Sequence, residues 1–115
     1  MAASDSVSNS LSQASAIQDG GFIAVDAVID GEMESIILHR DGDEIRAWLN
    51  ICPHAGRRLD LSPGRFLLDK GRLMCPMHGA LFRTTDGECV AGPCRGAHLK
   101  AVPVRVCDGE VVLER

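Results

Sequence analysis

Four side chains in two short stretches of this 115-residue chain have the types and spacing of metal ligands. The stretch CPHAG supplies Cys52 and His54, separated by one residue, and the stretch CPMHGALF supplies Cys75 and His78, separated by two. Twenty residues lie between the two pairs. Thiolate and imidazole groups are ligands for zinc, copper and iron–sulfur centres. The two pairs therefore predict one metal centre that is held by two loops.

Two kinds of metal centre use two cysteines and two histidines. A mononuclear zinc site takes two ligands of each type, but zinc fingers usually group the thiolates in one half of the motif and the imidazoles in the other. Here each half is mixed, with the cysteine first. This arrangement suits a cluster with two different irons, one held by Cys52 and Cys75 and the other by His54 and His78. That division of ligands defines the Rieske [2Fe–2S] centre.

The combined pattern CPHAG…CPMHGALF…DGECVAGPC resembles the Rieske iron–sulfur family, and specifically its soluble ferredoxin-type branch. The resemblance extends over roughly residues 20–115. It implies a β-sandwich with a smaller cluster-binding subdomain, and it implies that the two cysteine–histidine pairs ligate one [2Fe–2S] cluster per chain. It also implies that residues 91–94, AGPC, form the proline-containing loop that covers the cluster.

The chain departs from patterns within that family at several positions. The spacer between the ligand pairs is longer than in ferredoxin-type members, and RFLLDKGR, residues 65–72, is the expected insertion. High-potential respiratory members carry an extra disulfide where this chain has Arg57 and Met77. They also carry a serine after the second His-Gly and a nearby tyrosine, whereas this chain has Ala80 and no tyrosine. Fewer hydroxyl donors imply a reduction potential near the low end of the Rieske range.

Short β-branched runs separated by glycine and aspartate predict an all-β fold. One strand is predicted over 22–29, and hairpins are predicted over 34–40 with 45–50, over 65–75 with a turn at 69–71, and over 99–106 with 111–114. No stretch has the apolar period of about 3.6 residues that a helix requires. Together with the resemblance, these runs predict a Rieske-like β-sandwich of short antiparallel strands. Each ligand pair then falls on a loop after a strand, where a rigid scaffold positions reactive groups.

The first residues differ in composition from the rest of the chain. Residues 1–16 include six serines and few apolar side chains, which is typical of a mobile segment. We therefore expect a flexible serine-rich tail over residues 1–19 and a single Rieske domain over residues 20–115.

Charge and hydropathy argue against several classes of protein. The net charge of −4 argues against nucleic acid as the main partner. No apolar run approaches the roughly 18 residues of a membrane span, and the N-terminus lacks the basic and apolar regions of a secretory signal. Without export, five cysteines favour metal binding over a disulfide framework. We therefore expect a cytoplasmic protein.

Positive charge follows the first ligand pair. Residues 45–115 hold eleven bases and seven acids, a net +4, whereas residues 1–44 hold nine acids and one base, a net −8. Scatter along a chain that folds back on itself is an equally good explanation of this difference. Arg57 and Arg58 either guide a redox partner or form a salt bridge with Asp60, and we favour partner docking.

The remaining cysteines and histidines receive no functional role. Cys89, Cys94 and Cys107 are expected to be small buried apolar side chains, and Cys94 is the one that its place on the proline-containing loop makes accessible. His39 and His98 lie in strand-like surroundings and are assigned no function.

The expected function is the transfer of single electrons, and the chain itself is not expected to be an enzyme. It has no additional motif of two histidines and one carboxylate for mononuclear iron, so it is not itself a ring-hydroxylating oxygenase. We expect a freestanding carrier that receives electrons from a flavin- or NAD(P)H-linked reductase and delivers them to a terminal enzyme, with an oxygenase as the leading candidate. The alternatives are the small Rieske subunit of a nitrite-reductase-like complex and a non-redox zinc module.

Overall fold

The computed structural model of the chain describes residues 10–53 and 56–114. These residues form eleven strands in three antiparallel sheets, together with one short 3-10 helix, Ala14–Ala16. The predicted all-β class is therefore confirmed. Among the described residues, no helix has the length and apolar character needed to cross a membrane.

The central sheet contains, in order, β2 (Phe22–Ile29), β3 (Glu32–Asp41) and β4 (Glu44–Leu49). Neighbouring side chains of β3 point to opposite faces of this sheet. Ile36 and Leu38 belong to one buried apolar cluster, whereas Ile37 belongs to another. Both faces of β3 are therefore covered, which is why three apolar residues follow one another here instead of alternating with polar ones.

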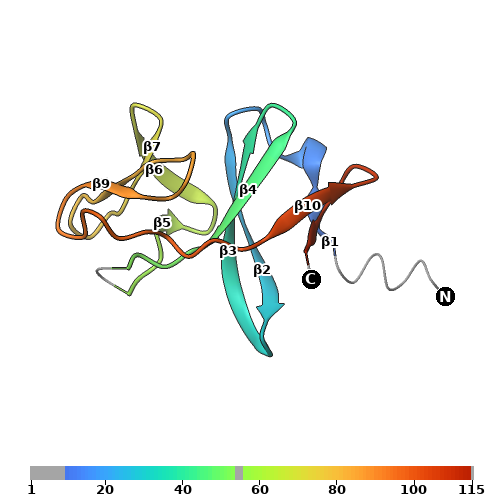
Figure 1. The fold of residues 1–115 in the computed structure, drawn as a ribbon, viewed down its shortest axis with the longest axis horizontal. Helices are drawn as coiled ribbons and strands as arrows, with labels where there is room; N and C mark the ends of the chain where they lie inside the picture. The colour runs from blue at the N-terminus through green and yellow to red at the C-terminus, as the bar shows by residue number, and fades with distance from the viewer. Residues whose placement is uncertain (1–9, 54–55, 115) are drawn as a thin grey trace.

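A second sheet covers one face of the central sheet and completes the β-sandwich. It contains, in order, β1 (Ser10–Gln13), β11 (Glu110–Leu113) and β10 (Val104–Cys107). The buried members of the sandwich core are Ile17, Ile36, Leu38, Ala47, Val102 and Val111. Figure 1 shows this sheet on the side of the molecule where the described chain begins and ends.

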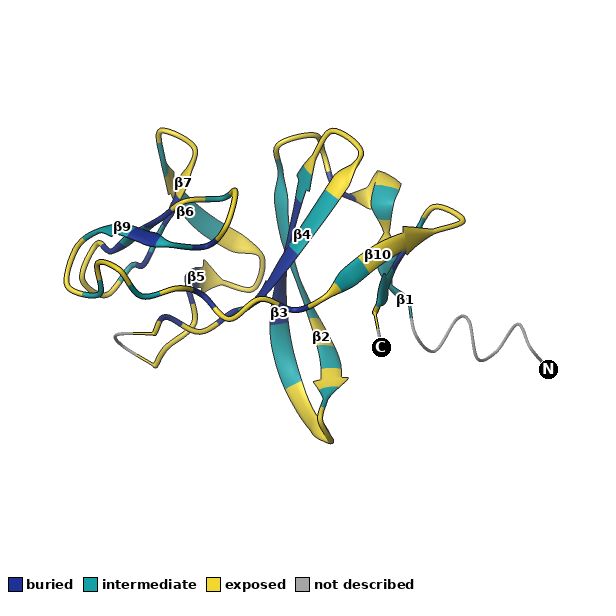
Figure 2. Cartoon of the chain, viewed as in Figure 1, coloured by how far each residue is buried: buried dark blue, intermediate teal, exposed yellow. Residues whose placement is uncertain are grey.

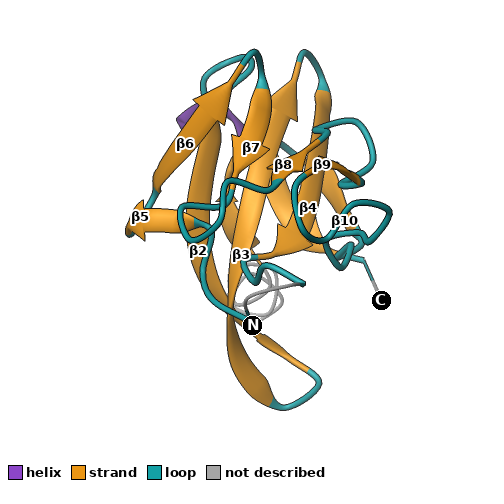
Figure 3. Ribbon diagram, turned by 90° about the vertical axis from the view of Figure 1, so that its left-hand side faces the viewer, coloured by secondary structure: helices purple, strands orange, loops and turns teal. Residues whose placement is uncertain are grey.

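A third sheet lies on the opposite side of the central sheet (Figure 1). It contains, in order, β5 (Asp60–Ser62), β6 (Arg65–Asp69), β7 (Arg72–Met74), β8 (Leu81–Phe82) and β9 (Cys89–Ala91). In the view toward this end, β6 to β9 lie in front of the central sheet (Figure 3). We call residues 50–97, which carry this sheet and its loops, the site subdomain. Its core is made by buried residues from both sheets: Ile37, Trp48, Cys52, Leu59, Leu73, Cys75, Ala80, Phe82, Cys89 and Leu99.

Burial along β3 and β4 shows how the two parts share one scaffold. The buried segments of both strands lie where the central sheet meets its two neighbours (Figure 2). On β4, Ala47 joins the sandwich core and Trp48 joins the core of the site subdomain. Because consecutive strand residues face opposite sides, a single sheet supports both.

The expected tail over residues 1–19 is wrong for its described part. Strand β1 pairs antiparallel with β11, with Ser12 opposite Val111, and Ile17 is fully buried. The serine-rich composition gave no signal for this strand because an edge strand is held chiefly by backbone hydrogen bonds to its neighbour. Residues 1–9 lie outside the described residues.

The predicted strand at 22–29 and two of the three hairpins are confirmed. β3 and β4 are joined by a turn that places Asp41 opposite Glu44, and β6 and β7 are joined by Lys70-Gly71. The third hairpin is shorter than expected, because only Val104–Cys107 pairs with β11. Pro103 lacks the N–H that a continuous ladder needs, and before it only a single bridge joins Ala101 to Trp48.

Candidate metal centre

The two loops that carry the cysteine–histidine pairs have matching backbone geometry. The first follows β4 and contains Cys52, and the second follows β7 and begins at Cys75. In each loop the cysteine carbonyl accepts a hydrogen bond from the glycine four residues later, from Gly56 at 2.8 Å and from Gly79 at 2.9 Å. Each cysteine N–H donates to the carbonyl of the residue after that glycine, at 2.8 Å in both loops. The shared spacing Cys-Pro-x-x-Gly is therefore closed by the same two hydrogen bonds in both loops.

Gly56 and Gly79 close these turns in a conformation that favours glycine. Their φ angles are +67° and +74°, in the region that side chains with a Cβ rarely adopt. Apart from the glycine itself and its two chain neighbours, no heavy atom of the described residues lies within 4 Å of the place that a Cβ would take at either residue. Backbone conformation, and not crowding by another part of the protein, explains these two glycines.

The two cysteine side chains meet beneath the loops. Both residues are only 1% exposed, and the Cys75 thiol interacts directly with the Cys52 thiol. Burial raises the pKa of the Cys75 thiol, and the neighbouring Cys52 sulfur raises it as well. The backbone N–H groups of Met77 and His78 donate to the Cys75 sulfur and oppose this rise. The second loop therefore supplies two hydrogen-bond donors to a thiolate at this position.

Only one of the two histidines predicted as ligands lies among the described residues. His78 is exposed, in contrast to the cysteine three residues before it. His54 was predicted as the partner ligand on the first loop, and it lies outside the described residues. Three of the four predicted ligands therefore have a described position, with Cys52 and Cys75 in contact and His78 on the loop that Cys75 begins.

A buried polar side chain holds the first loop from within the subdomain. Asn50 is fully buried. Its side-chain N–H donates to Ser35 Oγ at 3.2 Å, and its side-chain oxygen accepts from the Leu59 N–H at 2.8 Å. The residues immediately before and after the Cys52 loop are thus tied to β3. The sequence analysis missed Asn50, for which the only signal is a polar residue between a strand and the ligand motif.

An ion pair between Arg58 and Asp60 also holds the segment that follows the Cys52 loop. The Asp60 side chain is 0% exposed and accepts two hydrogen bonds of 2.8 Å from the Arg58 guanidinium and one of 3.1 Å from the Gly64 N–H. The Arg58 hydrogen bonds are the main reason that the pKa of Asp60 falls to about 2. Arg58 is therefore committed to a salt bridge, the alternative that we did not favour from sequence. Arg57 is exposed and forms no ion pair with the residues that the structure describes.

The proline-containing segment packs against the second loop. Gly92 has a φ of +100°, and a Cβ added there would lie 2.8 Å from Ala80 Cα. Ala80 directly follows Gly79 and is 1% exposed. The segment 91–94 thus rests on the loop that begins at Cys75, and only glycine allows this approach.

The other three cysteines occupy different environments. Cys89 is fully buried, Cys94 is half-buried and Cys107 is exposed, and none of them is in a disulfide. Burial and the neighbouring Cys89 sulfur raise the pKa of Cys94 to about 12. The expectation of a small buried side chain is right for Cys89 and wrong for Cys107, because Cys107 ends a strand whose last three residues are exposed.

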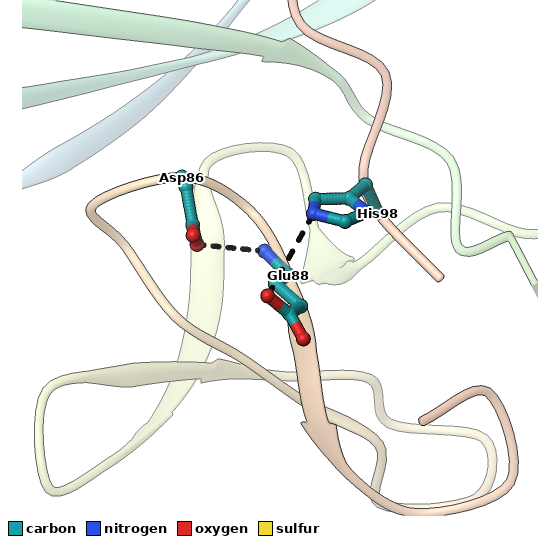
Figure 4. A group of neighbouring side chains, drawn as sticks. All are labelled: Asp86, Glu88 and His98. Atoms are coloured by element: carbon teal, nitrogen blue, oxygen red, sulfur yellow. Dashed lines mark hydrogen bonds and ion pairs between the residues drawn. The ribbon is translucent and has the colours of Figure 1, made fainter. Parts of the chain in front are cut away.

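A second group of side chains that could bind a metal ion already pairs with an arginine side chain. The ligand atoms of Asp86, Glu88 and His98 lie within 4.8 Å of one another (Figure 4). The Arg83 guanidinium donates to Asp86 at 2.6 Å and to Glu88 at 3.0 Å, and it lowers the pKa of Asp86 to about 2. We interpret this group, which the sequence analysis did not single out, as a surface ion-pair network.

Residues 10–108 match the Rieske [2Fe-2S] domain. The chain belongs to the Rieske family. The match begins where β1 begins and extends through β10, so it includes the site subdomain, the central sheet and all of the second sheet except β11. No curated protein matches the chain in sequence.

Comparison with solved structures shows that the chain is similar to ferredoxins of this family. The chain is similar to the ferredoxin of carbazole 1,9a-dioxygenase from Nocardioides aromaticivorans IC177, with 26% identity, a TM-score of 0.67, and coverage of 90% of this chain and 93% of the ferredoxin. A ferredoxin of Sphingomonas yanoikuyae B1 is also 26% identical, with a TM-score of 0.71 and coverage of 92% and 96%. The terminal oxygenase from the same Nocardioides strain matches over only 29% of its own length, with a TM-score of 0.71 and 26% identity.

The described residues fit the [2Fe–2S] cluster that a Rieske domain binds. Two buried thiols in mutual contact come from loops of matching shape, and one histidine lies on the second loop. Backbone N–H groups donate to one of the sulfurs, as they do around iron–sulfur clusters. The ferredoxin fold that was expected from the motifs is therefore confirmed, and the site has donors suited to its cofactor.

Proposed function

We propose that this chain is a one-electron carrier of the Rieske ferredoxin type. The observation that carries the proposal is the convergence of the two matched loops on the buried pair Cys52 and Cys75, with His78 exposed on the same loop as Cys75. When bound, a [2Fe–2S] cluster accepts and releases single electrons. A buried sulfur side protects the centre, and an exposed histidine side gives a partner protein access to it.

The residues of the chain divide the work of holding the cluster. In this proposal Cys52 and Cys75 bind one iron, and His54 and His78 bind the other. The N–H groups of Met77 and His78 stabilise negative charge on the Cys75 sulfur. Asn50 and the Arg58–Asp60 pair hold the two ends of the first loop in place.

The partners are proposed from the similar structures and from the chain itself. A related structure contains a reduced oxygenase with an oxidized ferredoxin of carbazole 1,9a-dioxygenase, and that ferredoxin is 27% identical to this chain. By analogy, the present chain receives electrons from a reductase and passes them to a terminal oxygenase, and it catalyses no reaction on a substrate itself. A cytoplasmic location, as expected from the sequence, is part of this proposal.

The ligand assignment is tested with two cysteine variants of the purified protein. The wild type is expected to be brown and to take up one electron per chain in a redox titration. Cys52→Ser should lose the visible absorption, because a serine hydroxyl is a poor ligand for this cluster. Cys107→Ser, at an exposed cysteine on β10, should keep it. A Cys52→Ser protein with an unchanged cluster spectrum would contradict the assignment.

Two further measurements separate the proposal from its alternatives. A colourless protein with stoichiometric zinc would identify a zinc module. Stable co-purification with a large reductase would identify a subunit. A carrier should instead purify alone and form only transient complexes with its redox partners.

A further inference from the structure

Two cysteines outside the proposed ligand set lie in contact. The Cys94 and Cys89 sulfurs are 3.1 Å apart. A disulfide bond is about 2.0 Å long, so the two sulfurs need to approach by about 1 Å to form one. Neither cysteine is one of the four proposed cluster ligands. Cys94 lies five positions after Cys89 in the sequence.

Backbone hydrogen bonds hold both cysteines in this position. The Cys89 N–H donates to the Ala97 carbonyl at 2.8 Å, and the Cys89 carbonyl accepts from the Gly96 N–H at 3.0 Å. The Cys94 carbonyl accepts from the Ala97 N–H at 2.8 Å. The same short stretch therefore holds the backbones of both cysteines, which brings their side chains to the same place in the fold.

Solvent access differs between the two thiols in a way that suits stepwise oxidation. Cys94 is half-buried and Cys89 is fully buried. An oxidant can reach Cys94, and only Cys94 or another buried group can reach Cys89. The segment between them contains Gly92, which rests on Ala80 of the second ligand loop.

We propose that Cys89 and Cys94 form an intramolecular disulfide that clamps residues 89–94 over the second ligand loop. The oxidant is a low-molecular-weight disulfide. The Cys94 sulfur attacks it, forms a mixed disulfide and releases one thiol. The Cys89 sulfur then attacks the Cys94 sulfur and releases the second thiol. Two protein thiols are oxidised to one disulfide, and the small disulfide is reduced to two thiols. The two protons lost by the protein thiols are taken up by the two small thiolates that leave.

Cys52 is the competing partner, because its sulfur also interacts with that of Cys94. In the protein with a bound cluster, the proposed function commits Cys52 to iron and leaves Cys89 as the partner. The inference rests on the proposed function in this one respect. A cross-link between Cys52 and Cys94 would overturn the ligand assignment and the Cys89–Cys94 disulfide together, whereas two reduced thiols at Cys89 and Cys94 in a protein that keeps its cluster would overturn the disulfide alone.

Peptide mapping of the cluster-loaded protein tests the bond directly. The protein is incubated with oxidised glutathione for hours, because the raised pKa of Cys94 makes exchange slow. It is then quenched with acid, labelled with N-ethylmaleimide and digested with trypsin. Cleavage after Arg83 and Arg95 releases residues 84–95, TTDGECVAGPCR, which contain both cysteines. The expected peptide is unlabelled and lighter by two hydrogen atoms, and it gains two maleimide groups when reduction precedes labelling.

Two variants give the controls. Cys94→Ser should leave Cys89 reduced and labelled, whereas Cys107→Ser should form the cross-link as the wild type does. Two maleimide groups on the wild-type peptide after oxidation, a glutathione retained on Cys94, or a cross-link to Cys52 would each overturn the proposal.

The clamping role has its own readout. In the oxidised wild type, loss of the cluster to an iron chelator should be several-fold slower than in the reduced protein. The Cys94→Ser protein should show no such difference between oxidising and reducing conditions. A disulfide that forms without slowing cluster loss would refute the clamp.

Discussion

Two carboxylates of the site subdomain have the same lowered pKa for the same reason, but they differ in burial. Asp60 and Asp86 both have pKa values lowered to about 2, each mainly by hydrogen bonds from an arginine. The Asp60 side chain is 0% exposed, whereas that of Asp86 is 44% exposed. Water already stabilises an exposed carboxylate, so its ion pair adds little to stability. A buried carboxylate depends on its partners.

Asp60→Asn should therefore lower the free energy of unfolding by about 1–2 kcal/mol at neutral pH. A carboxyl group with a depressed pKa stabilises the fold above the unfolded value of 3.8. That stability is lost as pH falls from about 4 toward 2, because the folded carboxylate is then protonated. The difference between wild type and variant should shrink over this range, as followed by denaturant unfolding and circular dichroism.

Asp86→Asn provides the matched control for this experiment. It removes a carboxylate with the same pKa from an exposed pair, and its effect on unfolding should be much smaller. Equal destabilisation by the two substitutions would show that burial is not what makes the Arg58–Asp60 pair important.

The residue after the second ligand loop's glycine bears on the expected reduction potential. Ala80 has no hydroxyl to donate to a cluster sulfur, and the chain has no tyrosine. The donors to Cys75 that the structure shows are the backbone N–H groups of Met77 and His78. We therefore expect a midpoint near the low end of the Rieske range, roughly −150 mV. Ala80→Ser should raise it, because a donor near the sulfurs favours the more negative reduced cluster.

A redox titration followed by electron paramagnetic resonance measures both midpoints. Ala101→Ser, which adds the same hydroxyl at an exposed position outside the site subdomain, should leave the midpoint unchanged. A wild-type midpoint well above zero would contradict the argument and would suit a respiratory role better than transfer to an oxygenase.

At the level of the elements, the contact between the proline-containing segment and the second loop is a tight constraint beside the proposed ligands. Gly92→Ala places a Cβ 2.8 Å from Ala80 Cα, closer than packed carbon atoms come. One of the two segments must therefore move. We expect cluster loss to a chelator to become several-fold faster, as followed by the decay of visible absorption.

Gly96→Ala separates crowding from backbone strain. Gly96 has a φ of +94°, close to the +100° of Gly92, but among the described residues no heavy atom beyond its chain neighbours lies within 4 Å of its Cβ position. Strain is therefore similar in the two variants, and only Gly92→Ala adds the clash. If both variants lose the cluster at the same rate, the contact with Ala80 does not matter for retention.

The elements also show what can be predicted from sequence and what cannot. Hairpins at 34–50 and 65–75 were predictable because alternating or β-branched runs flank short turns rich in glycine and aspartate. Strand β1 was not, because its four residues SLSQ have no strong strand preference and pair with β11 at the far end of the chain. Long-range pairing of this kind has no local signal.

The same distinction applies to the candidate metal centre. The residue types and spacing of the two cysteine–histidine pairs predicted one centre held by two loops, because that pattern depends on neighbouring residues. The support from Asn50, which reaches back to Ser35 on β3, and the approach of Gly92 to Ala80 join segments distant in sequence. Those contacts are visible only once the three sheets are assembled.

For the whole molecule, the fold separates charge between its two ends. The site subdomain, residues 50–97, holds seven bases and four acids, a net +3. The rest of the chain holds five bases and twelve acids, a net −7. The uneven charge along the sequence therefore stays uneven in space, since the site subdomain lies on one side of the central sheet (Figure 1). A basic end around the proposed cluster favours encounter with an acidic partner.

Arg57 is the residue through which this preference is best tested. It is exposed on the first ligand loop, and its guanidinium forms no ion pair with the described residues, whereas Arg58 is bound to Asp60. Arg57→Glu should slow electron transfer to or from the redox partner several-fold at low ionic strength. The difference should become smaller near 0.15 M salt, where exposed charges more than about 8 Å apart are largely screened. Arg105→Glu makes the same charge change on β10, across the central sheet from the site. Stopped-flow rates that fall equally for both variants would mean that net charge, and not a docking surface beside the cluster, governs the encounter.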